Sequence, residues 1–161
     1  MTAWTPHITV ATVVEKDGKF LFVEEGSEGL SHLVLNQPAG HVEANETLIE
    51  AAIRETREET GYSVDITALI GIYTYSPPMF PDRRYYRFCF LGHLLSEHAQ
   101  SELDPDIHAV HWMSVEEFQL TGRARSPLVN KAIQDTLSGQ RFPLSMIYEH
   151  CNVPFTSQLD A

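Results

Sequence analysis

Residues 40–62 read GHVEANETLIEAAIRETREETGY, and this stretch predicts a single bounded helix. Asn45 is a suitable N-cap, with Glu46 in the positively polarised first turn, and Gly61 is a suitable C-cap. The residues expected to face the core recur at helical spacing and are Ile49, Ala52, Ile53, Thr56 and Thr60. The stretch therefore predicts an amphipathic helix that packs on a domain core.

Three glutamates form a second stripe on this helix. Glu55, Glu58 and Glu59 are spaced i, i+3 and i+4, so their carboxylates project from one side within about one turn. Like charges repel there, and a multivalent cation is the simplest reason to gather them; hard oxygen ligands favour Mg²⁺ or Mn²⁺ over zinc. The alternative is a solvated face with pairs such as Glu50 and Arg54. A magnesium cluster would indicate phosphate chemistry.

The same stretch resembles the Nudix box, which is glycine, five residues, glutamate, seven residues, Arg-Glu, an apolar residue, any residue, Glu-Glu, any residue, glycine and an apolar residue. Every charged and glycine position matches, while Thr56 and Tyr62 occupy slots in which aliphatic residues are usual. Neither slot holds a ligand. The chain is also similar to a bacterial phosphatase of this family through residues 7–10, 36–41, 125–129, 139–141 and 154–156.

Length and composition indicate one domain. The 161 residues, 43% hydrophobic and 20% charged, are ordinary for a globular protein, and we expect one Nudix hydrolase domain over 1–161 with 138–161 as a tail packed on it. The start lacks a signal-peptide pattern and no apolar run approaches about 18 residues, so a cytoplasmic protein is expected. Cys89 and Cys151 are too few for a disulfide scaffold or a zinc site.

The formal net charge of −11 disfavours binding of a nucleic-acid polymer, because the overall field repels phosphate chains. A small phosphorylated substrate is compatible with that charge if Mg²⁺ and local arginines neutralise it. No membrane partner is expected. A monomer and a homodimer both remain open.

The order of predicted elements favours an α+β fold. An Asp-Gly turn at Asp17-Gly18 predicts a hairpin between strands at 8–14 and 20–23. Further strands are expected at 33–35, 85–95 and 109–113, one or two strands at 64–75, and helices after Ser114 and at 127–137. The resemblance sharpens this to the Nudix α/β/α sandwich, a mixed β-sheet between helices.

Resemblance to the family implies the roles of the box residues. Glu55, Glu58 and Glu59 are the implied metal ligands, with the Gly40 carbonyl as a further oxygen, and Glu58 and Glu59 are implied in catalysis. Arg54 is the implied orienting cation, which holds a glutamate by a charge-assisted hydrogen bond. An ordinary ion pair with Glu50 or Glu58 is the alternative role for Arg54.

The general base is less determined, because Nudix enzymes take it either from the box or from a later acidic loop. Glu102, Asp104 and Asp106 precede the strand that contains Trp112, and Asp106 is favoured because it lies just before that strand. An exposed turn carboxylate is the alternative reading for Asp106.

Three residues are candidates for substrate binding. Arg87 lies on a strand among Tyr85, Tyr86, Phe88 and Phe90, so it can offer a cation beside an aromatic surface, although these aromatics can equally be core. Gln37 and His41 adjoin the box and are within reach of a phosphate.

The resulting prediction is a Mg²⁺-dependent phosphohydrolase, in which Mn²⁺ can substitute, acting on small nucleoside di- and triphosphates. The resemblance adds thiamine-pathway pyrophosphates as substrates. The alternatives are a dinucleotide or nucleotide-sugar pyrophosphatase and a non-catalytic nucleotide-binding module. The box predicts diphosphate chemistry without choosing the group attached to the diphosphate.

Overall fold

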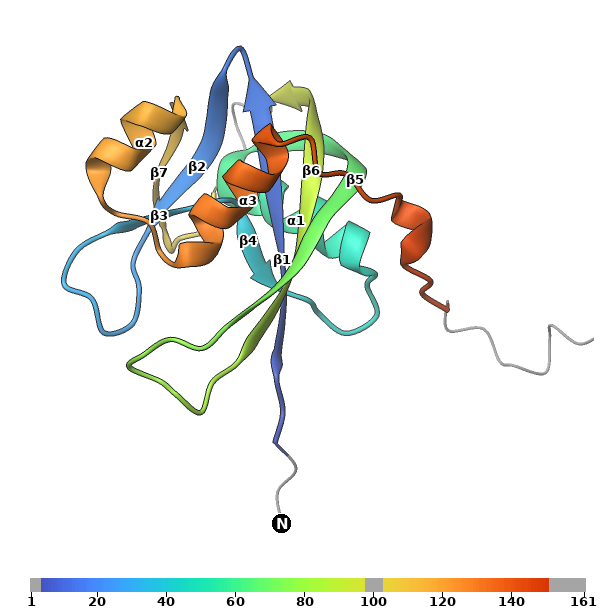
Figure 1. The fold of residues 1–161 in the computed structure, drawn as a ribbon, viewed down its shortest axis with the longest axis horizontal. Helices are drawn as coiled ribbons and strands as arrows, with labels where there is room; N and C mark the ends of the chain where they lie inside the picture. The colour runs from blue at the N-terminus through green and yellow to red at the C-terminus, as the bar shows by residue number, and fades with distance from the viewer. Residues whose placement is uncertain (1–3, 98–102, 151–161) are drawn as a thin grey trace, which may run out of the picture.

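The computed structural model of the chain describes residues 4–97 and 103–150 (Figure 1). Within these residues the strands are β1 (His7–Lys16), β2 (Lys19–Glu25), β3 (Val34–Asn36), β4 (Ala39–His41), β5 (Tyr62–Tyr75), β6 (Tyr85–Glu97) and β7 (Ile107–Met113). The helices there are α1 (Leu48–Thr60), α2 (Val115–Thr121) and α3 (Pro127–Leu137), and a 3-10 turn, η1, covers Leu144–Met146. None of the helices in the described ranges has the length and apolar character needed to cross a bilayer.

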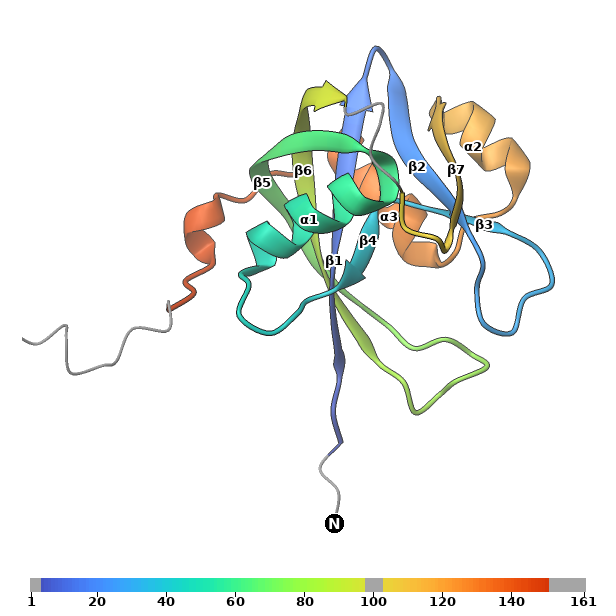
Figure 2. The ribbon, with the colours of Figure 1, turned by 180° about the vertical axis from the view of Figure 1, so that it is seen from behind.

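All these strands belong to one mixed sheet, which confirms the predicted α+β class. The main path is β3-β2-β1-β6-β5, with β4 paired to β1 and β7 paired to β2. Figures 1 and 2, seen from opposite sides, show α3 in front of one face of the sheet and α1 in front of the other. The layers are therefore helix, sheet and helix.

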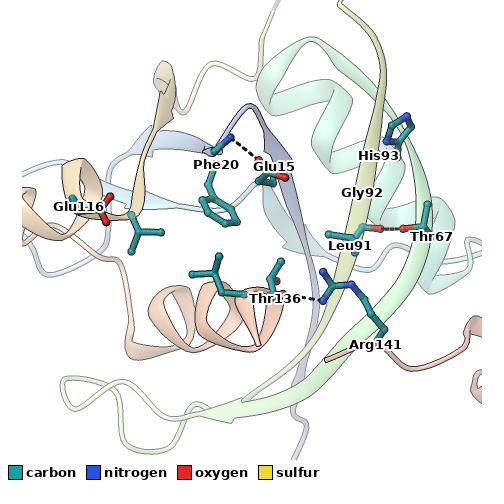
Figure 3. Close-up of a pocket in the computed structure, with 12 residues that line it drawn as sticks. Glu15, Phe20, Thr67, Leu91, Gly92, His93, Glu116, Thr136 and Arg141 are labelled. Carbon is teal, nitrogen blue, oxygen red and sulfur yellow. Dashed lines mark hydrogen bonds between the residues drawn. The ribbon is translucent and has the colours of Figure 1, made fainter. Parts of the chain in front are cut away.

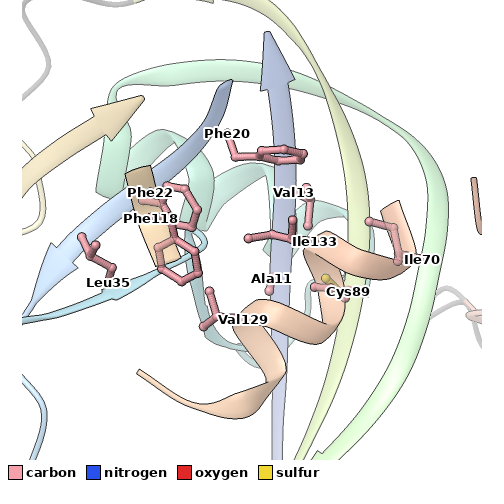
Figure 4. Packing of buried hydrophobic residues seen from close by; sticks show 11 residues of the cluster. Ala11, Val13, Phe20, Phe22, Leu35, Ile70, Cys89, Phe118, Val129 and Ile133 are labelled. Carbon is pink, nitrogen blue, oxygen red and sulfur yellow. The ribbon is translucent and has the colours of Figure 1, made fainter. Parts of the chain in front are cut away.

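The central strand β1 supplies side chains to both layers. Ala11 and Val13 belong to the buried cluster on the α3 side, whereas Val10 and Val14 belong to the cluster on the α1 side. Figure 4 shows the first cluster, in which α3 packs over β1. The period of two along a strand accounts for this division, and burial of β1 on both faces explains its nearly continuous apolar sequence.

The β1-β2 hairpin forms as predicted. Asp17 and Gly18 both have positive φ, 53° and 75°, as a type I′ turn requires. The Gly18 amide also donates to the Glu15 carboxylate over 2.7 Å. The predicted strand at 64–75 is one strand, β5, whose pairing with β6 shifts register at three places.

The pairing of β1 brings distant residues into one row. Thr9 lies opposite His41 of antiparallel β4 and opposite Arg87 of parallel β6. Directly opposed residues in a sheet project to the same face. This register places Arg87 beside the start of the Nudix box.

Helix α1 begins later than the sequence predicts. Its N-cap is Thr47, which forms a capping box with Glu50, and not Asn45, which has a φ of 70° in the preceding turn. Glu46 consequently precedes the helix instead of lying in its first turn. The C-cap at Gly61 is confirmed, with a φ of 72°. A reciprocal capping box satisfies two end groups at once, which favours Thr47 over Asn45.

The predicted core face of α1 is confirmed in part. Thr56 and Thr60 are buried, as is Ala52, but Ile49 and Ile53 are only half-buried against the α1-side cluster. The helix after Ser114 opens with the predicted capping box, in which Glu117 is the partner. In both α1 and α2 the capping box encoded in the sequence therefore marks the start of the helix in the folded protein.

Residues after α3 contact the sheet. Phe142 and Leu69 form an isolated antiparallel bridge, and Gln140 donates a side-chain bond to the Ile70 carbonyl. Leu144 and Ile147 pack against the α1-side cluster. Phe155, expected to pack on the domain, and Cys151 lie outside the described residues.

Candidate active site

On the charged side of α1, Arg54 forms ion pairs with three glutamates. Its Nε and Nη2 donate to both Glu46 oxygens over 2.9 and 2.6 Å, and its Nη1 donates to Glu55 and Glu58 over 2.8 and 3.0 Å. Nη2 also donates to the His41 carbonyl over 3.1 Å. These bonds, those to Glu46 above all, hold the pKa of Arg54 above its ordinary value. Arg54 therefore orients two of the three predicted ligands and ties α1 to β4.

Glu55 packs directly on the backbone of Gly40. A Cβ at position 40 would lie 2.1 Å from the Glu55 Oε1, so only glycine leaves room for this carboxylate. Burial raises the pKa of Glu55, with Arg54 acting in the opposite direction. The first glycine of the box is thus required by close approach of a carboxylate.

Gly40→Ala is expected to push Glu55 aside and lower kcat by about tenfold, roughly 1.4 kcal/mol of transition-state stabilisation. The comparison is Gly26→Ala, because a Cβ at Gly26 meets no atom within 4 Å. Steady-state kinetics of both purified variants measure the effect. Equal kcat values for the two variants would show that the Glu55 position is unimportant.

Glu59 is the buried member of the acidic stripe. Its side chain accepts a bond from the Ala39 amide over 2.9 Å, and the residue is 7% exposed. Burial raises its pKa to about 9, and the negative charges of Glu25, Glu55 and Asp104 act in the same direction. A positive charge at this place would relieve that repulsion.

The donors of the stripe suit a hard divalent cation, because they are carboxylate oxygens whose ionised forms are disfavoured by burial and by one another, and a cation would stabilise those forms. Glu58 is the exposed member, with half of its side chain in solvent. Within residues 4–97 and 103–150, no three His, Cys, Asp or Glu side chains already converge on one point. Arg54 serves as the counter-charge of Glu55 and Glu58 in this arrangement.

A cavity of about 480 Å³, here called the box cavity, opens beside the start of the box. We call the part of the cavity lined by strand residues its inner part; these residues include Gly40 and His41 of β4 and Arg87 of β6. The loops at 26–33 and 76–84 form its outer part, with Ser27, Glu28, Leu30, Pro77, Pro78, Met79, Phe80 and Arg83. Arg83 and Glu28 join the two loops by a 2.6 Å ion pair.

Arg87 faces this cavity. Its Nη1 donates to Asn36 over 3.1 Å, and its Nε is buried without a hydrogen-bond partner in the described part of the chain. Burial lowers the pKa of Arg87 below its ordinary value. A half-buried guanidinium whose buried Nε lacks an acceptor is costly unless an acceptor arrives, so the residue is suited to an anionic ligand.

The other two candidate substrate ligands are placed differently. His41 lines the cavity, and its Nε2 lies 3.1 Å from the Nδ1 of His7, which stacks on Tyr85. Burial lowers the pKa of His41. Gln37 is 1% exposed, and its amide donates to the Val129 carbonyl over 3.0 Å. The Gln37 side chain thus points toward α3 instead of lining the cavity.

The acidic loop meets the end of α1. The Asp104 amide donates to the Glu58 carbonyl over 2.9 Å, and the Asp104 carboxylate accepts from the Asp106 amide over 2.9 Å. Asp106 is exposed at the start of β7. Glu102 lies outside the described residues. The structure places the acidic loop beside the box, and the Asp104 side chain accepts a hydrogen bond within that loop.

A second cavity, of about 680 Å³, lies between the β1-β2 hairpin, α2, α3 and the β5-β6 pair (Figure 3). Arg141 lines this cavity and donates to the Thr136 carbonyl over 3.2 Å. The residues that line it include no member of the acidic stripe. It is therefore a poor candidate for the phosphate chemistry that the box predicts.

The sandwich, the acidic stripe and the adjoining cavity define a Nudix hydrolase, and the chain belongs to the Nudix family: the NUDIX domain model matches residues 5–131. Among its relatives is Phosphatase NudJ of Escherichia coli strain K12, with 45% identity over 152 residues that cover 94% of this chain and 95% of that protein. Phosphatase NudJ of Shigella flexneri matches equally. The predicted family and enzyme class are thereby confirmed.

Solved structures agree. A NUDIX hydrolase from Nitrosomonas europaea matches with a TM-score of 0.87 and 38% identity, over 92% of this chain and all of that one. A MutT NUDIX hydrolase from Burkholderia pseudomallei, at 17% identity, shares the fold with a TM-score of 0.68, over 81% of this chain and 98% of that one. Hydrolases of this family generally use a divalent metal and act on small phosphorylated substrates.

Proposed function

We propose that this chain is a Mg²⁺-dependent phosphohydrolase that cleaves phosphoanhydride bonds of small nucleoside di- and triphosphates and of thiamine-pathway pyrophosphates, with Mn²⁺ able to replace Mg²⁺. The observation that carries the proposal is the acidic stripe of α1 beside a cavity lined by the half-buried cation Arg87. The similarity to Phosphatase NudJ supports a phosphatase. Such chemistry needs a positioned water and neutralisation of phosphoryl charge.

Glu55, Glu58 and Glu59, with the Gly40 carbonyl, would hold the cation. When bound, it supplies neutralisation of the charge on the phosphoryl oxygens and lowers the pKa of water. Arg54 orients the Glu55 and Glu58 carboxylates through its fork of bonds. Glu59, fixed by the Ala39 amide, is the member least free to move.

The two parts of the box cavity then bind different parts of the substrate. His41 and Arg87 in the inner part face phosphate oxygens, and the loops of the outer part receive the attached group. Phe80 and Met79 give this outer part an apolar surface beside the Arg83-Glu28 pair. A planar or apolar group attached to a diphosphate suits such a surface.

The test is a panel of nucleoside di- and triphosphates, thiamine-type pyrophosphates, dinucleotides and nucleotide sugars, assayed with Mg²⁺ and with separate detection of phosphate and pyrophosphate. Phosphate release from the mononucleotides or thiamine-type substrates is expected. Preferential cleavage of dinucleotides or nucleotide sugars would make the protein a pyrophosphatase instead. Binding without turnover of any panel member would indicate a non-catalytic module.

Asp106 is proposed to activate water or to contact the outer shell of the metal. Asp106→Asn should lower kcat by about tenfold and change KM less, as loss of an outer-shell partner does. Glu102→Gln and Asp104→Asn are the comparisons, assayed in the same kinetics. A normal Asp106→Asn beside an impaired comparison would move the role to that other carboxylate.

A further inference from the structure

We propose that Arg125 and Arg87 form a two-cation subsite for the phosphoryl group that the box carboxylates do not bind, and that Glu25 and Asn36 are positioning residues for both guanidinium groups. The inference rests on the proposed function and deepens it. In the sequence taken alone, Glu25 carries no functional signal, and Asn36 is marked only as the first residue of the similar segment 36–41.

Asn36 is the centre of the network. Its Nδ2 donates to Glu25 over 3.0 Å, and its Oδ1 accepts from Arg87 over 3.1 Å. The other Glu25 oxygen lies 2.5 Å from Nη1 of Arg125. All four residues line the box cavity. One continuous chain of bonds therefore joins the two cations, and its two middle members are buried at 2% and 9% exposure.

The charge balance of this network points to an anion. The network contains two guanidinium groups and one carboxylate, because Arg125 pairs with Glu25 while Arg87, among the described residues, bonds only the neutral amide of Asn36, so it keeps an excess positive charge. Arg125 and Arg87 are close enough that the charge of Arg125 helps to lower the pKa of Arg87, after burial. The buried Nε of Arg87 has no partner among the described residues. A phosphoryl group supplies both the missing charge and the missing acceptor.

A neighbouring ion pair serves as the control for a purely structural role of the Arg125-Glu25 pair. Arg123 and Glu24, from the same two segments, form an equivalent ion pair that also includes His111, and neither Arg123 nor Glu24 lines the box cavity. Glu24 and Glu25 are successive strand residues and therefore face opposite sides of β2.

The segment at 123–125 is also held by main-chain bonds. The Leu35 amide donates to the Arg123 carbonyl over 2.7 Å, and the Arg125 amide donates to the Leu35 carbonyl over 2.9 Å. The backbone position of Arg125 is therefore established without its side chain. The Arg125 guanidinium is therefore available to bind a ligand in the box cavity.

The test uses imidodiphosphate, whose bridging nitrogen resists hydrolysis, and inorganic phosphate, each titrated calorimetrically with Mg²⁺ present. Arg125→Met and Asn36→Ala should weaken imidodiphosphate binding by about tenfold or more, because each loses or misplaces a charge-assisted bond. Binding of inorganic phosphate, which needs only the metal side, should change less than about twofold. Arg123→Met should match wild type with both probes.

Positioning is tested without a change of charge. Glu25→Asp withdraws the carboxylate by one methylene and should weaken imidodiphosphate binding several-fold, whereas Glu24→Asp should not. Asn36→Ala combined with Arg87→Lys should cost less than the sum of the single effects, since Asn36 acts through Arg87. If Arg125→Met melts early, Arg125→Lys, which keeps the charge and loses the planar fork, carries the same test.

Unchanged imidodiphosphate affinity in folded Arg125→Met and Asn36→Ala, or in folded Arg125→Lys, would overturn the subsite. Equal losses in Arg125→Met and Arg123→Met would also overturn it and assign both pairs to structure. Failure of the proposed function looks different. Wild-type protein would then bind imidodiphosphate, with the expected losses in the variants, and yet hydrolyse no member of the substrate panel.

Discussion

Replacing Glu58 or Glu59 by glutamine is expected to lower kcat by at least about 10²-fold at saturating Mg²⁺, comparable to the loss of a strong electrostatic contact in a transition state. Each change removes a ligand charge and leaves the proposed cation with fewer oxygen donors. Steady-state kinetics with a nucleoside triphosphate measure the loss. Glu43→Gln, which alters an exposed carboxylate before α1, is the matched control and should retain full activity.

Folding of these two variants should be nearly unaffected. Glu58 is half exposed, and glutamine replaces the buried Glu59 with the same shape while its amide oxygen can still accept from Ala39. Melting curves therefore distinguish loss of chemistry from loss of structure. Near-wild-type turnover in both variants would remove the metal site from α1.

Arg87→Ala is expected to raise KM for a nucleoside triphosphate by about 10- to 100-fold, the range of one or more charge-assisted hydrogen bonds. Arg87 lines the box cavity with an unsatisfied Nε, so its loss removes a cation from the phosphate site. The increase should be smaller for an analogue with fewer phosphates. Arg87→Lys should recover only part of the affinity, because an ammonium group cannot reproduce the guanidinium fork.

Arg84→Ala is the control for this change, because Arg84 is exposed on the neighbouring loop. An unchanged KM together with a lower melting temperature in Arg87→Ala would make Arg87 a structural residue. The substrate cation would then be sought at Arg125, which lines the same cavity. Arg141 lines the second cavity and is therefore not an alternative.

The sequence alone was sufficient for features that depend on local pattern. Gly61 and the Asp17-Gly18 turn occupy the positive-φ positions that their residue types favour, whereas the metal-binding role of the three box carboxylates stays a prediction. The start of α1 was predicted wrongly because Asn45 and Thr47 are both good N-caps, and only Thr47 has Glu50 three residues later as its partner. The Thr47-Glu50 spacing in the sequence therefore already indicated the correct start of α1.

The tertiary structure alone decided what faces the box cavity. Parallel pairing of β1 with β6 sets Thr9 opposite Arg87, which is 78 residues away in the chain, and antiparallel pairing with β4 sets the same Thr9 opposite His41. The register of long-range strands follows from the burial of both sheet faces, which no local pattern encodes. The same packing turned Gln37 toward α3 and set Asn36 against Arg87 directly and against Arg125 through Glu25, because neighbouring residues of an extended chain project to opposite sides.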